Sequence, residues 1–239
     1  MSKLLSQIAE NLSFIIGAGA IIVGLALLAK VTEHFLPDMR KVSPARRVSI
    51  IGICAALATI LHILDFPLVF LAPEFYKVDF SEVPVLLCGF FLGPSATVAC
   101  EGVKIILKLL VKSTSTAFVG DFANFAVGCS LVLPATIIYH AHKSKHSALI
   151  GLAVGCVCMT VFGSAFNAIY LLPKFAELYQ LPLDSIVAIG NDINANIHSV
   201  STLVCFAVAP LNLNKGSMIS VLTLLLYKRV ARPLFGRTK

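Results

Sequence analysis

The sequence predicts an all-α fold, a polytopic bundle of membrane-spanning helices. Two observations support this prediction. Of the 239 residues, 58% are hydrophobic and only 13% are charged, and the apolar residues run through nearly the whole chain. A helix that crosses a bilayer needs about 20 largely apolar residues, so a chain of this length has room for six or seven spans and their connections. No stretch remains for a separate soluble catalytic domain.

Hydropathy along the chain predicts seven helices, separated by segments rich in proline, glycine, serine and threonine. The predicted ranges are 12–31, 47–64, 82–99, 100–112, 120–140, 147–173 and 196–228. The first is longer than the apolar core of a cleaved signal peptide and no cleavage site follows it, so we expect a retained helix. The fourth is too short to cross comfortably, which predicts a tilted or internally packed helix. Long loops are expected at 65–81 and 174–195.

Positive charges fall in three clusters, and these predict the orientation in the membrane. The clusters are Arg40, Lys41, Arg46 and Arg47; Lys143 and Lys145; and Lys228, Arg229, Arg232, Arg237 and Lys239. With seven helices, all three lie on one side, which the positive-inside rule makes cytoplasmic. The C-terminus is then expected inside and the N-terminus outside. The net charge of +7 is interpreted as a topology signal and not as a surface for nucleic acid.

Lys215 is the sharpest candidate site residue, because a charge in the bilayer interior costs a few kcal/mol or more unless it is paired or hydrated. It precedes Lys228 by roughly 20 Å of helix, which places it towards the outer end of the last span. Asn212 and Asn214 add amide donors and acceptors beside it. Two interpretations stay open: a ligand contact or buried ion pair, and a lysine that snorkels to the outer interface.

Four charged residues, Glu101, Lys104, Lys108 and Lys112, follow helical spacing and share one face of a predicted helix. In one interpretation all four line a polar wall of a cavity. In the other, Glu101 and Lys104 form an internal ion pair, and Lys108 and Lys112 reach the outer surface. The second interpretation is favoured for Lys108 and Lys112.

Amides inside apolar spans give further candidates. Asn167 lies in an aromatic-rich span, where an unsatisfied amide is costly, so it must bond to another helix or to a ligand. Asn124 and Asp121 present the same argument near the outer end of another helix. Asp79 and Glu82 have an alternative role as capping acids for the helix that follows them.

The loop at 65–77 combines two prolines with large apolar side chains, among them Phe66, Leu68 and Phe70. Proline stiffens a loop, and exposed aromatic side chains are poorly tolerated unless they cover something. The loop is therefore interpreted as a lid over a flat, partly apolar ligand or, equally, as an anchor in the lipid headgroup region.

The second predicted helix is rich in small residues, which let membrane helices pack closely: Gly52, Ala55, Ala56 and Ala58. This pattern alone is weak, because small residues are frequent in membrane helices. The sequence contains no Walker A, HExxH or GxSxG motif, so it predicts no catalytic residue, no metal site and no cofactor. Uphill transport by this chain would draw its energy from a partner or from an ion gradient.

From about residue 46 onward the chain resembles the riboflavin-specific branch of the substrate-binding (S) components of energy-coupling-factor (ECF) vitamin importers. Six blocks carry the resemblance together, and none is specific alone. In order, they are Phe66-Pro67, 77–84 (KVDFSEVP), 89–94 (GFFLGP), 120–125 (GDFANF), 167–173 (NAIYLLP) and 209–216 (APLNLNKG).

The resemblance implies a six-helix S-component core at 46–239, preceded at 1–45 by one extra transmembrane helix and a basic linker. It implies high-affinity binding of riboflavin, as the transported ligand and not a cofactor, in a prokaryotic cell membrane. The implied partners are a membrane scaffold subunit, which would dock on the Gly52–Ala58 face, and two cytoplasmic ATPases. The implied ligand contacts are led by Asn167, Lys215 and Asn124, followed by Asp79, Asn212, Asn214, Glu101, Phe66, Leu68 and Phe70.

Three alternatives stay open. Val103-Lys-Ile105 and Gly120-Asp121 depart from the usual family pattern of Lys-Asn and Gly-Glu, which leaves FMN or another vitamin as the ligand. A self-sufficient secondary transporter would show inverted repeats with broken helices, and the sequence shows none. A membrane packing or assembly subunit would need neither Lys215 nor Asn167 and would bind no flavin.

Overall fold

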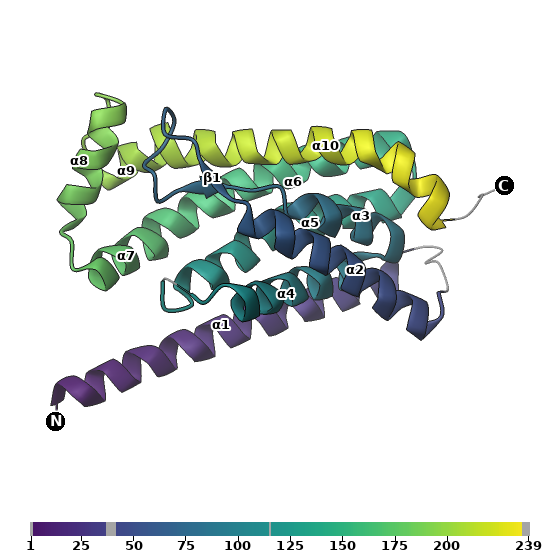
Figure 1. Cartoon of the computed structure of the whole chain (residues 1–239), viewed down its shortest axis with the longest axis horizontal. Helices are drawn as coiled ribbons and strands as arrows, with labels where there is room; N and C mark the ends of the chain where they lie inside the picture. Colours follow the sequence, from purple (N-terminus) through teal and green to yellow (C-terminus); the bar gives the residue numbers. More distant parts are fainter. Residues whose placement is uncertain (1, 37–41, 115, 236–239) are drawn as a thin grey trace.

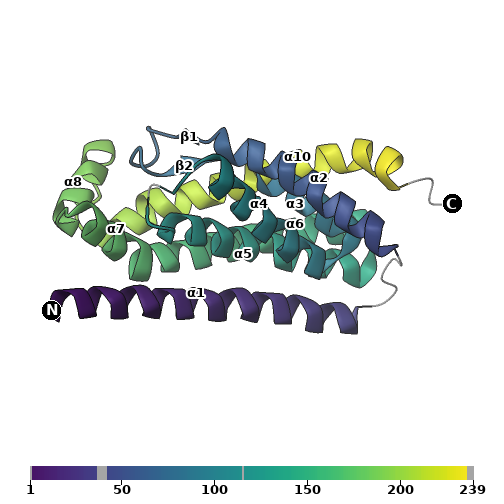
Figure 2. The same cartoon turned by 60° about the horizontal axis from the view of Figure 1, so that its bottom comes forward.

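Helices make up most of the chain and run roughly parallel to one long axis (Figures 1 and 2), as the predicted all-α class requires. The computed structural model describes residues 2–36, 42–114 and 116–235. The helices are α1 (Ser2–Phe35), α2 (Pro44–Ile63), α3 (Glu82–Leu92), α4 (Pro94–Val111), α5 (Val119–His142), α6 (Lys145–Phe166), α7 (Leu172–Tyr179), α8 (Leu183–Ile193), α9 (Val200–Leu203) and α10 (Ala209–Phe235). Two π-helical turns, η1 (Asn167–Leu171) and η2 (Val204–Val208), join α6 to α7 and α9 to α10.

The two ends of the bundle differ. One end holds the 65–81 loop, α7, α8 and the N-terminus of α1, and we call it the loop end; the C-terminus lies at the opposite end (Figure 1). Within the loop, strands β1 (Phe66–Pro67) and β2 (Lys77–Val78) form a short antiparallel pair. Four cations of the predicted clusters, Arg40, Lys41, Arg237 and Lys239, lie outside the described residues.

Within the part of the chain that the structure describes, four helical segments are long and apolar enough to cross a membrane: Phe14–Phe35, Pro44–Ile63, Val119–His142 and Lys145–Tyr179. They correspond to four of the seven predicted helices. Helix α4 is interrupted by Glu101, Lys104 and Lys108, and α3 has 11 residues, so composition alone does not select either one as a span.

The predicted boundary between the helices at 82–99 and 100–112 was wrong. The break lies at Gly93, whose φ of 102° is readily adopted only by glycine, and Pro94 opens α4 with its fixed φ. Hydropathy continues unbroken across this point, so a composition scan does not detect it. The break lets α3 and α4 fold back on each other.

The predicted loop at 174–195 was also wrong, because α7 continues to Tyr179 and α8 fills Leu183–Ile193. Pro182 precedes α8, which buries one face through Ile186, Val187 and Gly190. An 11-residue helix with one apolar face has a mixed composition, so average hydropathy does not reveal it.

Close contact between α5 and α6 makes the centre of the bundle rigid. A Cβ on Gly155 would lie 2.4 Å from the carbonyl oxygen of Leu131, and one on Gly151 would lie 2.6 Å from that of Ala135, so only glycine permits this approach. The surrounding core contains Leu86, Leu131, Leu152 and Ile219 from α3, α5, α6 and α10. This core supports the polar site at the loop end.

Candidate ligand-binding site

A cavity of about 340 Å³ lies at the loop end of the bundle, between the 65–81 loop, α4, α5, α6 with η1, α7 and α10. This volume falls within the ~300–1,000 Å³ range typical of small-molecule sites. Five of the predicted site residues line it: Asp79, Asn124, Asn167, Asn212 and Lys215. They come from four elements far apart in the sequence, so the fold assembles them in one place.

The other predicted site residues do not line the cavity, which corrects their expected placement. Glu101 is fully buried in an ion cluster beneath the cavity, and Asn214 is exposed on another face of α10 from Lys215. Phe66 and Leu68 pack against the apolar cluster formed by α8, α9 and η2, while Phe70 is 76% exposed. The lid interpretation therefore does not rest on these three side chains.

The aromatic residues that do line the cavity are ones that the sequence analysis did not name as site residues. The 65–81 loop contributes Phe75 and Tyr76 to the cavity, and α7 contributes Phe175 and Tyr179. The two on α7 stand four residues apart on an amphipathic turn, a helical spacing that was available in the sequence. The cavity thus combines flat apolar walls with a polar interior.

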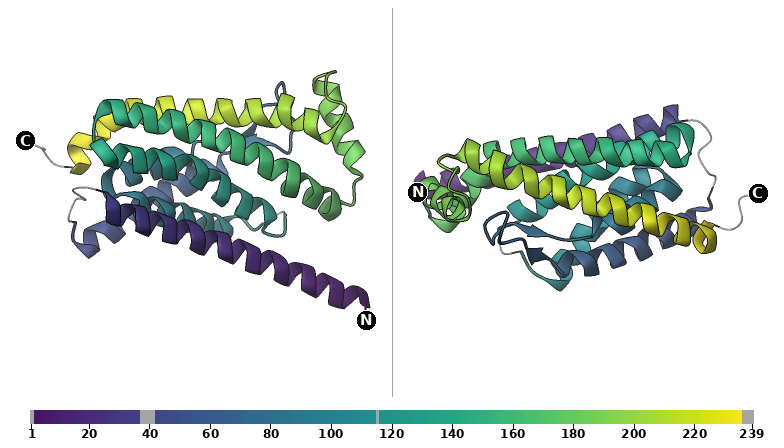
Figure 3. Two further views of the ribbon diagram at one scale, coloured as in Figure 1. Left: turned by 180° about the vertical axis from the view of Figure 1, so that it is seen from behind. Right: turned by 90° about the horizontal axis from the view of Figure 1, so that it is seen from above.

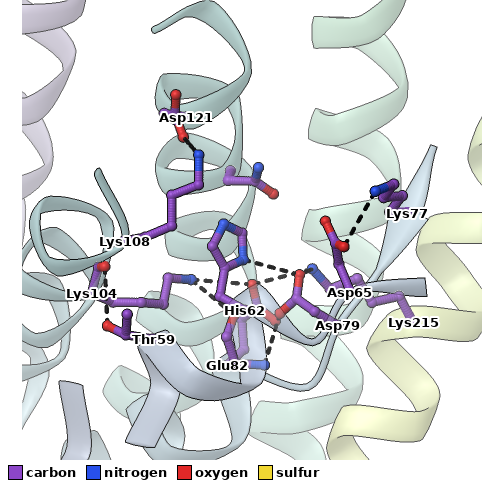
Figure 4. Close-up of polar contacts among 12 residues, drawn as sticks. Thr59, His62, Asp65, Lys77, Asp79, Glu82, Lys104, Lys108, Asp121 and Lys215 are labelled. Atoms are coloured by element: carbon purple, nitrogen blue, oxygen red, sulfur yellow. Dashed lines mark hydrogen bonds and ion pairs between the residues drawn. The ribbon is translucent and has the colours of Figure 1, made fainter. Parts of the chain in front are cut away.

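Lys215 is 8% exposed, and its ammonium donates to Asp79 Oδ2 at 3.1 Å and to Glu82 Oε1 at 3.3 Å (Figure 4). An ammonium has three N–H donors. Two are directed at carboxylates, which leaves one for an acceptor in the cavity. Of the two interpretations, the structure therefore shows the buried ion pair and not a lysine that snorkels to the outer interface, and the third N–H leaves Lys215 a candidate ligand contact.

Lys104 differs from Lys215 because all three of its donors are occupied within the chain. Its ammonium donates to Ser81 Oγ at 3.1 Å, to Glu82 Oε1 at 3.5 Å and to Glu101 Oε1. Lys104 is fully buried and does not line the cavity. The predicted Glu101–Lys104 pair is confirmed within α4, and the bonds of Lys104 to Ser81 and Glu82 hold α4 against the start of α3.

The expectation that Lys108 reaches the outer surface was wrong. Lys108 pairs with Asp121 of α5 and lines the cavity, with its side chain 13% exposed (Figure 4). Lys112 is exposed and also borders the cavity. Both lysines thus border the cavity, where they could bind a polar or anionic part of a ligand.

His62, in the last turn of α2, is a site residue that the sequence reading missed. Its Nδ1 lies 3.3 Å from Asp79 Oδ2, the same oxygen that accepts from Lys215. Asp79 Oδ1 accepts from the backbone N–H of Ser81 at 2.8 Å, so Asp79 also fixes the start of α3. The sequence did not indicate this role, because His62 is a single histidine in an apolar helix and no helical spacing connects it to Asp79. This partner becomes apparent only in the folded chain.

Asn212 lines the cavity, and its amide nitrogen lies against Gly163 without a hydrogen-bond partner among the described residues. A Cβ on Gly163 would lie 2.7 Å from this buried nitrogen. A buried donor without a partner is costly, so a site of this kind is complete only when an acceptor arrives. Because Asn212 also lines the cavity, its amide is a candidate donor to a ligand.

Asn167 and Asn124 have amide groups that bond within the chain. Asn167 Oδ1 accepts from the Tyr76 hydroxyl at 2.9 Å, and its Nδ2 donates to the Gly163 carbonyl at 2.7 Å. Burial raises the pKa of Tyr76 above its ordinary value, so the phenol stays protonated and donates. Asn124 Nδ2 donates to the Gly120 carbonyl at 3.1 Å. The Tyr76–Asn167 bond ties the 65–81 loop to η1 across the cavity.

Replacing Asn212 with leucine is expected to weaken ligand binding by about 10-fold, the value of one lost hydrogen bond, without lowering the stability of the ligand-free protein. Stability is preserved because the amide N–H has no partner to lose. Binding and thermal unfolding of the N212L variant measure the two effects. Unchanged affinity, or a large loss of stability, would remove Asn212 from the site.

Comparison with known proteins identifies the family. The sequence profile of the substrate-specific component of ECF transporters matches residues 46–227, well over half of the chain. The chain belongs to this family. It is therefore a substrate-binding S component of a membrane transporter and not an enzyme.

Individual relatives agree with this assignment. The S component described here is 34% identical over 186 residues to the riboflavin transporter RibU of Staphylococcus aureus (strain TCH60), an alignment that covers 78% of this chain and 90% of that protein. It is 27% identical over 183 residues to the riboflavin transporter FmnP of Bacillus subtilis (strain 168), covering 76% and 90%. A solved S component of a bacterial ECF transporter superposes with a TM-score of 0.63 and 32% identity, covering 82% of this chain and all of that one.

Proposed function

We propose that this S component binds riboflavin from outside a prokaryotic cell and passes it to the cytoplasm as part of an ECF importer. The relatives with the matching profile are named riboflavin transporters. The observation that carries the proposal for this chain is the pair of available donors, one N–H of Lys215 and the buried N–H of Asn212, in a cavity walled by aromatic rings.

Riboflavin matches this arrangement part by part. Its ring system is flat and aromatic, suited to packing against Phe75, Phe175 or Tyr179. The pyrimidine edge of the ring carries carbonyl oxygens, which need donors such as those of Lys215 and Asn212. The ribityl hydroxyls need polar neighbours, which the cavity supplies around Asn124, Asp121 and Lys108.

The 65–81 loop is proposed as the lid of this site. It is fixed by the β1–β2 pairing and by the Tyr76–Asn167 hydrogen bond, and it places Phe75 and Tyr76 at the cavity. The hydroxyl–amide bond contributes about 1 kcal/mol, and Ala72, Tyr76 and Val78 of the loop are also buried in the apolar cluster with α8, α9 and η2, so opening the lid must break both sets of contacts.

Titration of riboflavin, FMN and lumichrome into the purified protein, followed by flavin fluorescence, tests the ligand. Lumichrome has the ring system without the ribityl chain, and FMN adds a phosphate. We expect saturable quenching by riboflavin at one per chain and weaker binding of lumichrome. FMN binding equal to that of riboflavin would assign the phosphate to the Lys108–Lys112 side of the cavity, and no quenching by any of the three would overturn the proposal.

We propose that a membrane scaffold subunit and two ATPases complete the importer, because the chain has no nucleotide-binding motif of its own. The outer face of α2 is the proposed docking surface. Ala55 and Ala58, which the sequence suggested as docking residues, are fully buried within the bundle. We therefore do not include them in the proposed docking surface. Gly52 and Ala56 are exposed, and a Cβ on Gly52 would meet no atom within 4 Å.

Replacing Ala56 with tryptophan is expected to lower riboflavin uptake by the assembled transporter about 10-fold or more, because a large side chain on a close-packed surface is poorly accommodated. Riboflavin binding by the isolated S component should not change. Leu225→Trp on α10, at a position 63% exposed, is the matched control. Normal uptake by the A56W variant would rule out this face for docking.

The proposed orientation places the loop end and the N-terminus outside and the C-terminus in the cytoplasm. The 65–81 loop and the N-terminus of α1 lie at the same end of the bundle (Figure 1), and residues of this loop line the cavity. The cationic Arg46, Arg47, Lys143 and Lys145 lie near helix ends on the opposite side. This distribution follows the positive-inside rule. The division into a 1–45 extra segment and a 46–239 binding domain is part of the same proposal.

A further inference from the structure

We propose that helix α1 is a buttress of the ligand cavity and that Phe14 is a positioning residue for two of its walls. This inference rests on the proposed flavin-binding function. The family profile begins at residue 46, so α1 lies outside the segment that the profile describes. Helix α1 packs along α4 and α5 and leaves the proposed docking face of α2 uncovered (Figures 2 and 3).

Phe14 completes an aromatic cluster at the loop end. Its ring stacks on Tyr170 at a centroid distance of 6.4 Å and an interplanar angle of 10°, and it meets Phe122 edge to face at 5.9 Å. Phe166 joins the same cluster at 5.3 Å from Tyr170 and 6.2 Å from Phe122. The cluster therefore connects α1 to α5, α6 and η1.

The segments that contribute Tyr170 and Phe122 to this cluster, η1 and the start of α5, also contribute residues that line the cavity. In η1, Asn167 and Leu171 line the cavity, while Tyr170 turns towards Phe14. In α5, Asp121 and Asn124 line the cavity, while Phe122 between them turns towards Phe14. Helical geometry fixes these faces relative to each other, so support at Tyr170 and Phe122 limits movement of the cavity residues beside them.

The packing of Phe14 on Tyr170 supports an uncommon backbone conformation, the π-helical turn η1. A π-helix is rare and occurs mostly as single turns, frequently at functional sites. In η1 the turn carries Asn167, which holds the lid through Tyr76. Packing on its outer side stabilises this uncommon backbone and hence the position of Asn167.

A contact at the other end of α1 fixes the helix in place. Glu33 Oε2 accepts from the backbone N–H of Ser95 at 3.2 Å, and Glu33 Oε1 lies 3.5 Å from Arg47 Nη2. Arg47 in turn donates to Ser95 Oγ at 2.6 Å. The N-cap residue of α4 is Gly93, which has no side chain to cap the helix, so Glu33 supplies the acceptor and the negative charge that a helix N-terminus favours. Helix α1 is thus attached at Phe14 and near its C-terminus.

The middle of α1 contributes little to this attachment. Among residues 14–35, only Ala29 is buried, against α4 and α5. The contacts of Phe14 and Glu33, with Ala29 between them, therefore hold α1 against the bundle. Loss of the Phe14 contact would free the loop end of the helix and leave the cavity walls unsupported on that side.

Phe14→Ala in the full-length chain tests this inference. We expect riboflavin to dissociate about 3- to 10-fold faster, the loss of one aromatic contact, while the association rate stays unchanged. Phe14→Tyr keeps the ring and should restore the slow rate. Ile15→Ala, at a neighbouring position that is 63% exposed, is the matched control and should behave as the unmodified protein. Stopped-flow flavin fluorescence measures both rates.

The outcomes separate the two proposals. If the unmodified protein binds riboflavin and F14A releases it no faster than I15A, the buttress is overturned and the proposed function stands. If the unmodified protein binds no flavin, both are overturned. If F14A does not fold, Phe122→Leu removes the same contact from the α5 side, and an unchanged dissociation rate in that variant overturns the buttress.

Discussion

Replacing Lys215 with methionine is expected to weaken flavin binding strongly and to destabilise the protein. The ammonium is the partner of Asp79 and Glu82, which are both buried. Removing one side of a buried ion pair typically costs about 3–5 kcal/mol because the remaining charge has no compensation. The lost charge-assisted hydrogen bond to the ligand adds about 1.5–3 kcal/mol, or roughly 10- to 100-fold in affinity. Fluorescence titration and thermal unfolding of the K215M variant measure the two losses.

Lys145→Met provides the control for this experiment, because Lys145 is an exposed lysine at the start of α6. A surface substitution of this kind is expected to change stability by less than about 0.5 kcal/mol and to leave binding unchanged. The N212L variant separates the effects further, since it removes a cavity donor without breaking an ion pair. Wild-type affinity in K215M would show that the ligand does not use this lysine.

Replacing Lys104 with methionine is expected to cause the largest loss of stability, again about 3–5 kcal/mol or more, with a smaller effect on the affinity of the molecules that remain folded. Its ammonium serves Ser81, Glu82 and Glu101 and does not line the cavity. The comparison of K104M with K215M therefore distinguishes a structural lysine from a ligand-binding one. Thermal unfolding, followed by titration below the unfolding temperature, is the measurement.

A second substitution tests the reason for the loss. In K104M the Glu101 carboxylate is buried without its partner, so adding Glu101→Gln removes a charge and should recover part of the lost stability. The two residues are in contact, so their effects are not expected to be additive. Wild-type stability in K104M, or a double variant less stable than K104M, would contradict the assignment of this cluster.

The sequence was sufficient to predict the fold class and the most important polar residues, because a membrane makes both conspicuous. Long apolar runs predict spans, and a polar residue within one must have a partner or a ligand. Lys215, Asn167 and Asn124 were found in this way, and all three line the cavity. The Glu101–Lys104 pair followed from helical spacing alone.

The remaining details depend on the packing of elements that are distant in the sequence. Asn212 and Asn214 are equivalent in a sequence scan, yet only Asn212 faces the cavity, because packing of α10 against α6 sets the rotation of the helix. His62 gains its role only when the 65–81 loop brings Asp79 to it. Phe66, Leu68 and Phe70 seemed suited to a lid, but the β1–β2 pairing presents Phe75 and Tyr76 to the cavity in their place.

The visible absorption spectrum of the detergent-purified protein, expressed in riboflavin-containing medium and washed thoroughly, tests the central claim most directly. A flavin spectrum at close to one equivalent per chain, much reduced in N212L and more strongly reduced in K215M, is the predicted result. A colourless wild-type protein that also leaves the fluorescence of added riboflavin unchanged would contradict it.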